Sequence, residues 1–112
     1  MIAARLADAL GDGGALVMAR ADDAVDILIE KTRAAAADGR ESVLLAIGED
    51  VATMRRAMLR AAIASLAVDC APACRINALD IAAGASVDAI VAAATFLAAA
   101  HSTTGQVVEL NP

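Results

Sequence analysis

Residues 57–79 read AMLRAAIASLAVDCAPACRINAL and contain a helix, a turn and a strand in that order. Leu59, Ile63 and Leu66 recur at helical spacing, so the first part is predicted to be the end of an amphipathic helix. Pro72 closes the helix because its ring cannot continue it. The apolar residues that follow Arg75 are typical of a buried strand. This order, helix into apolar strand, is the repeating unit of α/β proteins.

The alternation of helix and strand continues towards both ends of the chain. Short apolar runs predict buried strands over residues 15–19, 42–47, 75–81 and 106–110. Helical spacing predicts helices over residues 2–10, 22–38, 51–70 and from Ser86 to about Ala100. Ser86 is a good N-cap for the last helix, and the carboxylate of Asp88 suits its positive end.

Strands that alternate with helices predict a parallel sheet with helices packed on it, and each crossover is expected to be right-handed. The fold class is therefore α/β, with about four parallel strands and an additional N-terminal helix. If the strands follow one another in one direction, the connecting helices share one face of the sheet. The other face then needs the N-terminal helix or a partner subunit to cover it, because an uncovered apolar face is a large exposed hydrophobic patch that promotes association.

Composition and charge limit the class of function. The chain has 112 residues, which fits one domain over residues 1–112, and a formal net charge of −5. No basic stripe is present to bind phosphates, so nucleic acid is not an expected partner. Arginines interrupt every apolar run before it reaches the ~18 residues of a membrane span. The start of the chain does not resemble a signal peptide, so we expect no membrane partner and a cytoplasmic location.

Two stretches resemble the C-terminal half of short-chain dehydrogenases/reductases (SDRs). One is residues 57–79, quoted above, and the other is residues 95–112, TFLAAAHSTTGQVVELNP. In that family a helix of the type YxxSKxAlxxlTrsLAvElAP leads to a strand RVNAi, then to a helix ending in FLA and a closing strand TGQvlxVDGG. The resemblance implies a truncated, half-Rossmann domain, because the family's cofactor-binding first half has no counterpart here.

The resemblance also locates the family's catalytic positions. The tyrosine position falls on Ala52, the lysine position on Arg56 and the serine position near Gly48. The asparagine motif NNAG becomes residues 18–21, and the Pro-Gly after RVNAi becomes residues 80–82. The chain has no tyrosine to exchange a proton, and arginine cannot relay one as lysine can. We therefore expect no catalytic residue and no oxidoreductase chemistry by this chain alone.

Cofactor and metal sites are not expected either. Gly11, Gly13 and Gly14 precede a strand, whereas a dinucleotide fingerprint follows one. Cys70 and Cys74 lack the further ligands of a zinc site and are interpreted as reduced packing residues. The acids that precede or begin the helices are interpreted as capping groups that repel phosphate: Asp22, Asp23, Glu49, Asp50 and Asp88. The polar loop at residues 101–104 is interpreted as a solvated turn.

Three functions remain open. The first is a non-catalytic structural or regulatory subunit that forms a homo-oligomer or assembles with a full-length SDR enzyme. The second is a small ligand-binding protein that uses the carboxyl ends of the strands, and the third is an enzyme subunit whose active site a partner chain completes. Residues predicted to be divided between core and interface are Met54, Met58, Ile63, Phe96, Val107 and Leu110.

Overall fold

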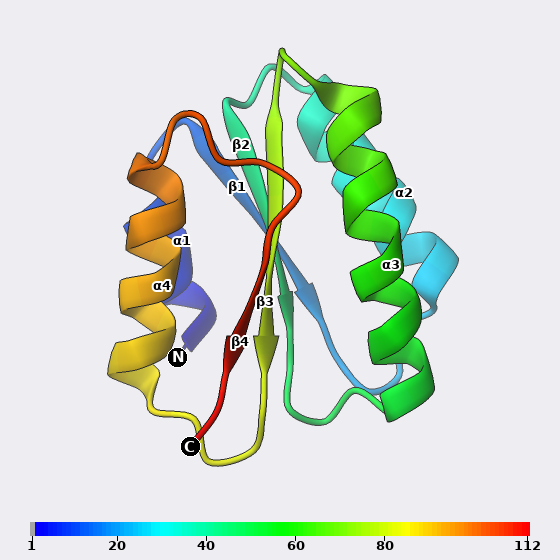
Figure 1. The fold of residues 1–112 in the computed structure, drawn as a ribbon, viewed down its shortest axis with the longest axis vertical. Helices are drawn as coiled ribbons and strands as arrows, with labels where there is room; N and C mark the ends of the chain where they lie inside the picture. The colour runs from blue at the N-terminus through cyan, green and yellow to red at the C-terminus, as the bar shows by residue number, and fades with distance from the viewer. Residues whose placement is uncertain (1) are drawn as a thin grey trace.

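The computed structural model describes residues 2–112 and contains four helices and four strands in strict alternation (Figure 1). The elements are α1 (Ile2–Leu10), β1 (Gly14–Ala19), α2 (Val25–Ala37), β2 (Ser42–Ile47), α3 (Thr53–Cys70), β3 (Arg75–Ile81), α4 (Val87–Ala99) and β4 (Val107–Leu110). The predicted element order is confirmed. The largest differences lie at the starts of α2 and α3, which begin three and two residues later than the apolar spacing predicted.

The four strands form one parallel sheet in the order β1-β2-β3-β4. The fold is therefore the predicted Rossmann-like α/β fold. Every residue of β2 is buried, because this strand has a neighbour on each side and helices on both faces. All strand C-termini point to one edge of the sheet, which is the edge where ligands bind in open α/β folds.

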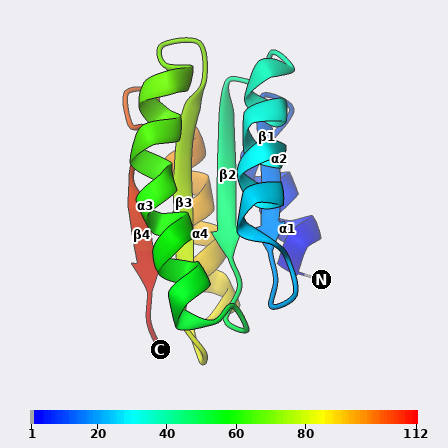
Figure 2. The ribbon, with the colours of Figure 1, turned by 90° about the vertical axis from the view of Figure 1, so that its right-hand side faces the viewer.

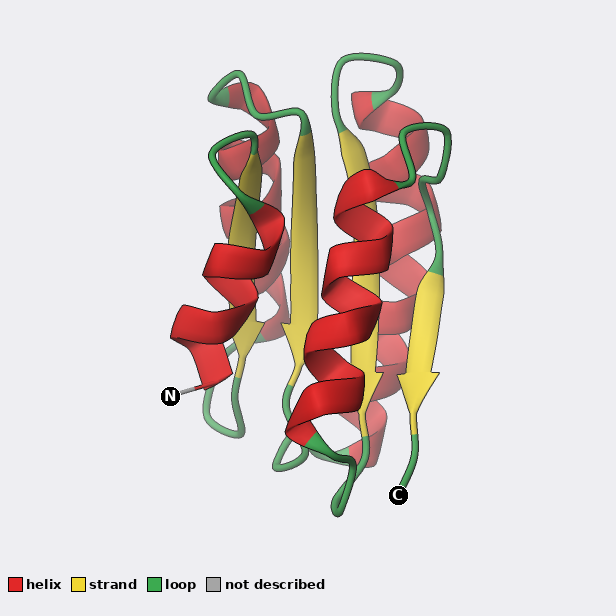
Figure 3. Cartoon of the chain, turned by 90° about the vertical axis from the view of Figure 1, so that its left-hand side faces the viewer, coloured by secondary structure: helices red, strands yellow, loops and turns green. Residues whose placement is uncertain are grey.

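The helices form two layers. Figure 2 shows α2 and α3 on one face of the sheet, and Figure 3 shows α1 and α4 on the other. All three strand-to-strand connections step the same way across the sheet. Because α4 lies on the opposite face from α2 and α3, the β3–α4–β4 connection has the opposite hand to the two right-handed connections before it. The expectation that every crossover is right-handed is wrong for this one.

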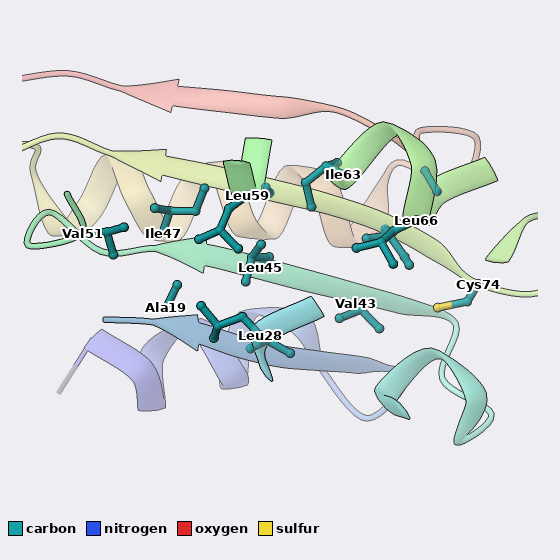
Figure 4. Close-up of a cluster of buried hydrophobic side chains, with 14 residues drawn as sticks. Ala19, Leu28, Val43, Leu45, Ile47, Val51, Leu59, Ile63, Leu66 and Cys74 are labelled. Atoms are coloured by element: carbon teal, nitrogen blue, oxygen red, sulfur yellow. The ribbon is translucent and has the colours of Figure 1, made fainter. Parts of the chain in front are cut away.

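This arrangement gives the chain two cores. The first lies under α2 and α3 and contains Leu28, Leu45, Leu59 and Ile63 (Figure 4). The second lies under α1 and α4, where Leu6 and Leu10 pack near Ile90 and Leu97. Since α1 and α4 together cover the second face, the sheet itself does not need a partner subunit to bury its apolar side chains.

Candidate functional site

Arg56 joins two strand ends at the carboxyl edge of the sheet. Its guanidinium donates to the carbonyls of Gly48 (2.7 Å) and Val51 (3.0 Å), which lie between β2 and α3. It also donates to the carboxylate of Asp80 and to the carbonyl of Ile81 (3.3 Å) at the end of β3. The side chain is only 18% exposed. Arg56 therefore acts as a crosslink, and both terminal nitrogens of its guanidinium bind the protein's own acceptors.

Asp80 is the centre of a larger ion-pair network. Its second carboxylate oxygen accepts from Arg60, one turn after Arg56 on α3. Arg60 also donates to Glu109 of β4 at 3.0 Å. Hydrogen bonds from Arg60 to Asp80 and Glu109 raise the pKa of this arginine above its ordinary value, so it stays cationic. This network was not predicted from the sequence, where the one available signal was two arginines four residues apart on one helix.

The positions that correspond to the family's catalytic residues carry no acid–base pair. Ala52 is the N-cap of α3 and contributes only a methyl group where the tyrosine would lie. Arg56, at the lysine position, has its donors occupied as described above. The five residues from Gly48 to Ala52 connect β2 directly to α3. What the structure shows at these positions is charge pairing and hydrogen bonding.

Two hollows open at the same edge. One, of about 380 Å³, lies beside the ion-pair network and is lined by the carboxylates of Glu49, Asp80 and Glu109, which outnumber the one cation in its lining, Arg56. The other, of about 400 Å³, has an apolar lining that includes Met18, Ile81 and Ile90. Arg20, Glu49 and Asp50 also line this second hollow. The first hollow disfavours anions, and the second suits an apolar group.

The acids at the helix starts behave only partly as predicted. Ser86 caps α4 by accepting from the backbone N–H of Ala89 at 3.1 Å, and Asp88 lies in the first turn, as expected. The N-caps of α2 and α3 are Ala24 and Ala52, which make no side-chain cap. Asp23 instead accepts from the backbone N–H of Arg20 at 2.9 Å and stabilises the turn before α2. The prediction that acids cap these two helices is therefore wrong.

No group of three or more His, Cys, Asp or Glu side chains within residues 2–112 is arranged to hold a metal ion. Cys74 is buried, and both cysteines are free thiols. Desolvation raises the pKa of the Cys74 thiol above its ordinary value, with a smaller contribution from nearby Cys70. Over the same described residues, no helix is both long and apolar enough to cross a membrane.

The residues that carry the family resemblance have structural roles. The Arg75 guanidinium donates to the carbonyls of Leu97, Ala98 and Ala100, and so caps the C-terminus of α4. Buried Asn77 donates to the carbonyl of Thr103 (3.1 Å) and accepts from the backbone N–H of Gln106 (3.0 Å).

The loop between α4 and β4 is held by backbone contacts as well. The Thr104 hydroxyl accepts from the N–H of Ile76, and the Gly105 N–H donates to the Ile76 carbonyl at 2.7 Å. Gly105 has a φ of 77°, which a residue with a Cβ rarely adopts. The two resembling stretches therefore bind each other and attach α4 and β4 to β3.

The predicted interface residues separate into three groups. Met54, Met58 and Phe96 are exposed, at 77%, 51% and 65%. Val107 and Leu110 on β4 are half-buried. Ile63 is fully buried in the first core, so it is a core residue and offers no surface.

Three exposed apolar side chains were not predicted to be at an interface: Ile27 on α2, Val68 on α3 and Val87 on α4. Of the two placements left open, core or interface, the core is wrong for Met54 and Met58, because both are exposed while Leu59, Ile63, Leu66 and Ala67 are the buried residues of α3. Helical spacing identifies the apolar residues of the helix but does not say which of them contact the sheet.

Comparison with known proteins agrees with the fold and with the interlocked motifs. No curated protein matches the chain, and no solved structure matches it. A family model described as "Short chain dehydrogenase-like protein" matches residues 8–110, which is nearly the whole chain. With the RINA strand, the TGQ turn and the parallel sheet all in place, this chain belongs to the SDR-like, short-chain dehydrogenase-like family.

Proposed function

We propose that this chain is a cytoplasmic, non-catalytic SDR-like subunit that associates with itself or with a full-length dehydrogenase. The observation that carries the proposal is the state of Arg56. At the family's lysine position, this side chain is 18% exposed and donates to three carbonyls and one carboxylate of its own chain. A group held in this way supports the sheet edge and is not available to a substrate.

The outer face of α3 supports the association part of the proposal. Its exposed residues are mostly apolar or small and recur at helical spacing: Met54, Ala57, Met58, Ala61, Ala64, Ser65 and Val68. Such a face fits a second helix, because alanines let helices approach closely and methionines adapt to the partner's shape. The partner we favour is the same helix face of a second copy or of a full-length family member.

Light scattering on the purified chain, with identification of native pull-down partners, tests the proposal. We expect a dimer or larger, or a co-purified dehydrogenase, and Met54→Glu with Met58→Glu should remove the part of the association that the outer face of α3 provides. The matched control is Ala89→Glu with Ala92→Glu on exposed positions of α4. A monomer with no partner at working concentrations would refute the proposal. Dehydrogenase activity that appears only on mixing with a partner would support the partner-completed enzyme instead.

The apolar hollow of about 400 Å³ favours a second candidate, a small ligand-binding protein. Its lining suits an apolar or acyl group, and the carboxylates of Glu49 and Asp50 oppose an anionic head group. Thermal-shift measurements across nucleotides and acyl thioesters test this candidate. A shift with acyl compounds that is lost in Met18→Asp would support it, whereas no shift with any compound would count against it.

A further inference from the structure

Strand β1 forms one edge of the sheet and lacks the features that normally protect an edge. Its sequence, GALVMA over residues 14–19, contains no charge and no proline. Figure 3 shows β1 as the outermost strand on the N-terminal side. The opposite edge differs, because β4 has only four residues and includes Glu109, which is paired with Arg60. Proteins usually block strand pairing with charges, prolines or short strands, and β1 has none of these.

The hydrogen-bond pattern shows which backbone groups of β1 face outward. The carbonyls of Gly13 and Ala19 accept from the N–H groups of Ser42 (3.3 Å) and Gly48 (2.9 Å), on the side of β2. In a parallel ladder, alternate residues bond to opposite sides, so Leu16 and Met18 direct their N–H and C=O groups away from β2. The Gly14 carbonyl also faces outward and already accepts from Arg40 at 3.3 Å. Leu16 and Met18 therefore provide the free donors and acceptors of this edge.

The charges that flank β1 are complementary under a two-fold rotation. Asp12 and Arg20 are both exposed, and neither side chain is in an ion pair with any of residues 2–112. Each lies four residues from Leu16, one before it and one after it. Asp12 lies in the turn before β1, and Arg20 directly follows the strand. If two copies of β1 pair antiparallel about Leu16, Asp12 of each chain comes to the same end of the pair as Arg20 of the other, so opposite charges meet at both ends. The two Leu16 residues then exchange both backbone hydrogen bonds, because their free groups face each other.

We propose that β1 pairs antiparallel with β1 of a second copy, centred on Leu16, and joins the two four-stranded sheets into one. The interface is isologous, and the opposite charges of Asp12 and Arg20 favour this pairing over one that brings like charges together. It does not use the outer face of α3 and does not rest on the proposed function. A one-residue slip would turn Leu16 and Met18 away from their partners, so hydrogen bonding and charge select the same register.

Reciprocal charge reversal tests the pairing. All variants carry Met54→Glu and Met58→Glu, which removes association through α3, and sedimentation measures the dimer dissociation constant. We expect this background to dimerise, and Asp12→Arg or Arg20→Asp alone to raise the constant about tenfold, since two attractive pairs become repulsive. An equimolar mixture of the two single variants, and the double variant Asp12→Arg with Arg20→Asp, should restore the background constant.

The outcomes separate this proposal from the proposed function. A background that is monomeric at all concentrations, or single variants that dimerise as well as the background, would overturn the pairing. Failure of the mixture to recover would overturn the register. Circular dichroism on each variant confirms folding, which exposed Asp12 and Arg20 should not affect. Association through α3 is measured independently, by comparing the native chain with the Met54→Glu, Met58→Glu background.

Discussion

Replacing Asp80 with asparagine should destabilise this protein more than removing the neighbouring charge of Glu109. The carboxylate accepts from Arg56 and Arg60 at once, and its side chain is 13% exposed. Breaking a fully buried ion pair costs roughly 3–5 kcal/mol, and an exposed pair contributes about 0–1 kcal/mol. Arg56 is largely buried but keeps three carbonyl acceptors, and Arg60 keeps Glu109. We therefore expect Asp80→Asn to lower the free energy of unfolding by about 2 kcal/mol.

Urea denaturation followed by circular dichroism measures this loss, with Glu109→Gln as the matched control. Glu109 is 56% exposed and bonds only to Arg60, so its substitution should cost about 0.5 kcal/mol. The Asp80 effect should change little between low and high salt, because a largely buried pair is screened weakly. A loss for Asp80→Asn no greater than that for Glu109→Gln would refute the reasoning. It would mean that the network is a surface arrangement with no structural role.

Three further predictions follow from burial. Asn77→Ala should lower the free energy of unfolding by about 2 kcal/mol and speed amide exchange at residues 103–106, measured by mass spectrometry, because it removes both hydrogen bonds between the Asn77 side chain and this loop. Unchanged exchange would mean that these hydrogen bonds do not hold the loop. Iodoacetamide should modify half-buried Cys70 before buried Cys74, and equal modification rates would count against the burial of Cys74. Because burial raises the folded-state pKa of Cys74, the contribution of the neutral thiol to stability should be present at neutral pH and lost as pH rises through that pKa. Cys74→Ala should remove this pH dependence. In urea or thermal unfolding, Ile63→Ala should lower the free energy of unfolding by about 2–5 kcal/mol, because the side chain is fully buried. Phe96→Ala should lower it by less than about 1 kcal/mol, because the side chain is 65% exposed. Similar losses for the two variants would mean that the burial of these residues is misassigned.

The features of the carboxyl edge of the sheet were predictable only where they depend on residue identity. The absence of tyrosine and the alanine at position 52 can be read directly from the sequence. The use of Arg56 could not be read in this way, because its partner Asp80 lies 24 residues further along the chain and on a different element. The first residues of α3 meet the far end of the following strand, β3, only after the helix has packed back along the sheet.

The interface candidates show the same division. The spacing of Ile63, Met54 and Met58 on one helix identified an apolar arc but not the part of it that meets the sheet. Packing of α3 on β3 buries Ile63 and leaves both methionines in solvent. On α4, likewise, Leu97 is buried while its neighbour Phe96 is exposed, although phenylalanine is the larger apolar residue.

The sequence by itself determined the order and approximate limits of the helices and strands, because apolar periodicity, Pro72 and the Ser86 cap act within a few residues. It also determined the family, through the RINA and TGQ stretches. Only the tertiary structure decided that α4 crosses to the face of α1 and reverses the hand of the last connection, and that Arg56 is held by Asp80. The position of α4 and the pairing of Arg56 both depend on contacts between residues far apart in the chain. Forming such contacts costs conformational entropy, and packing of the whole sheet with its helices offsets that cost.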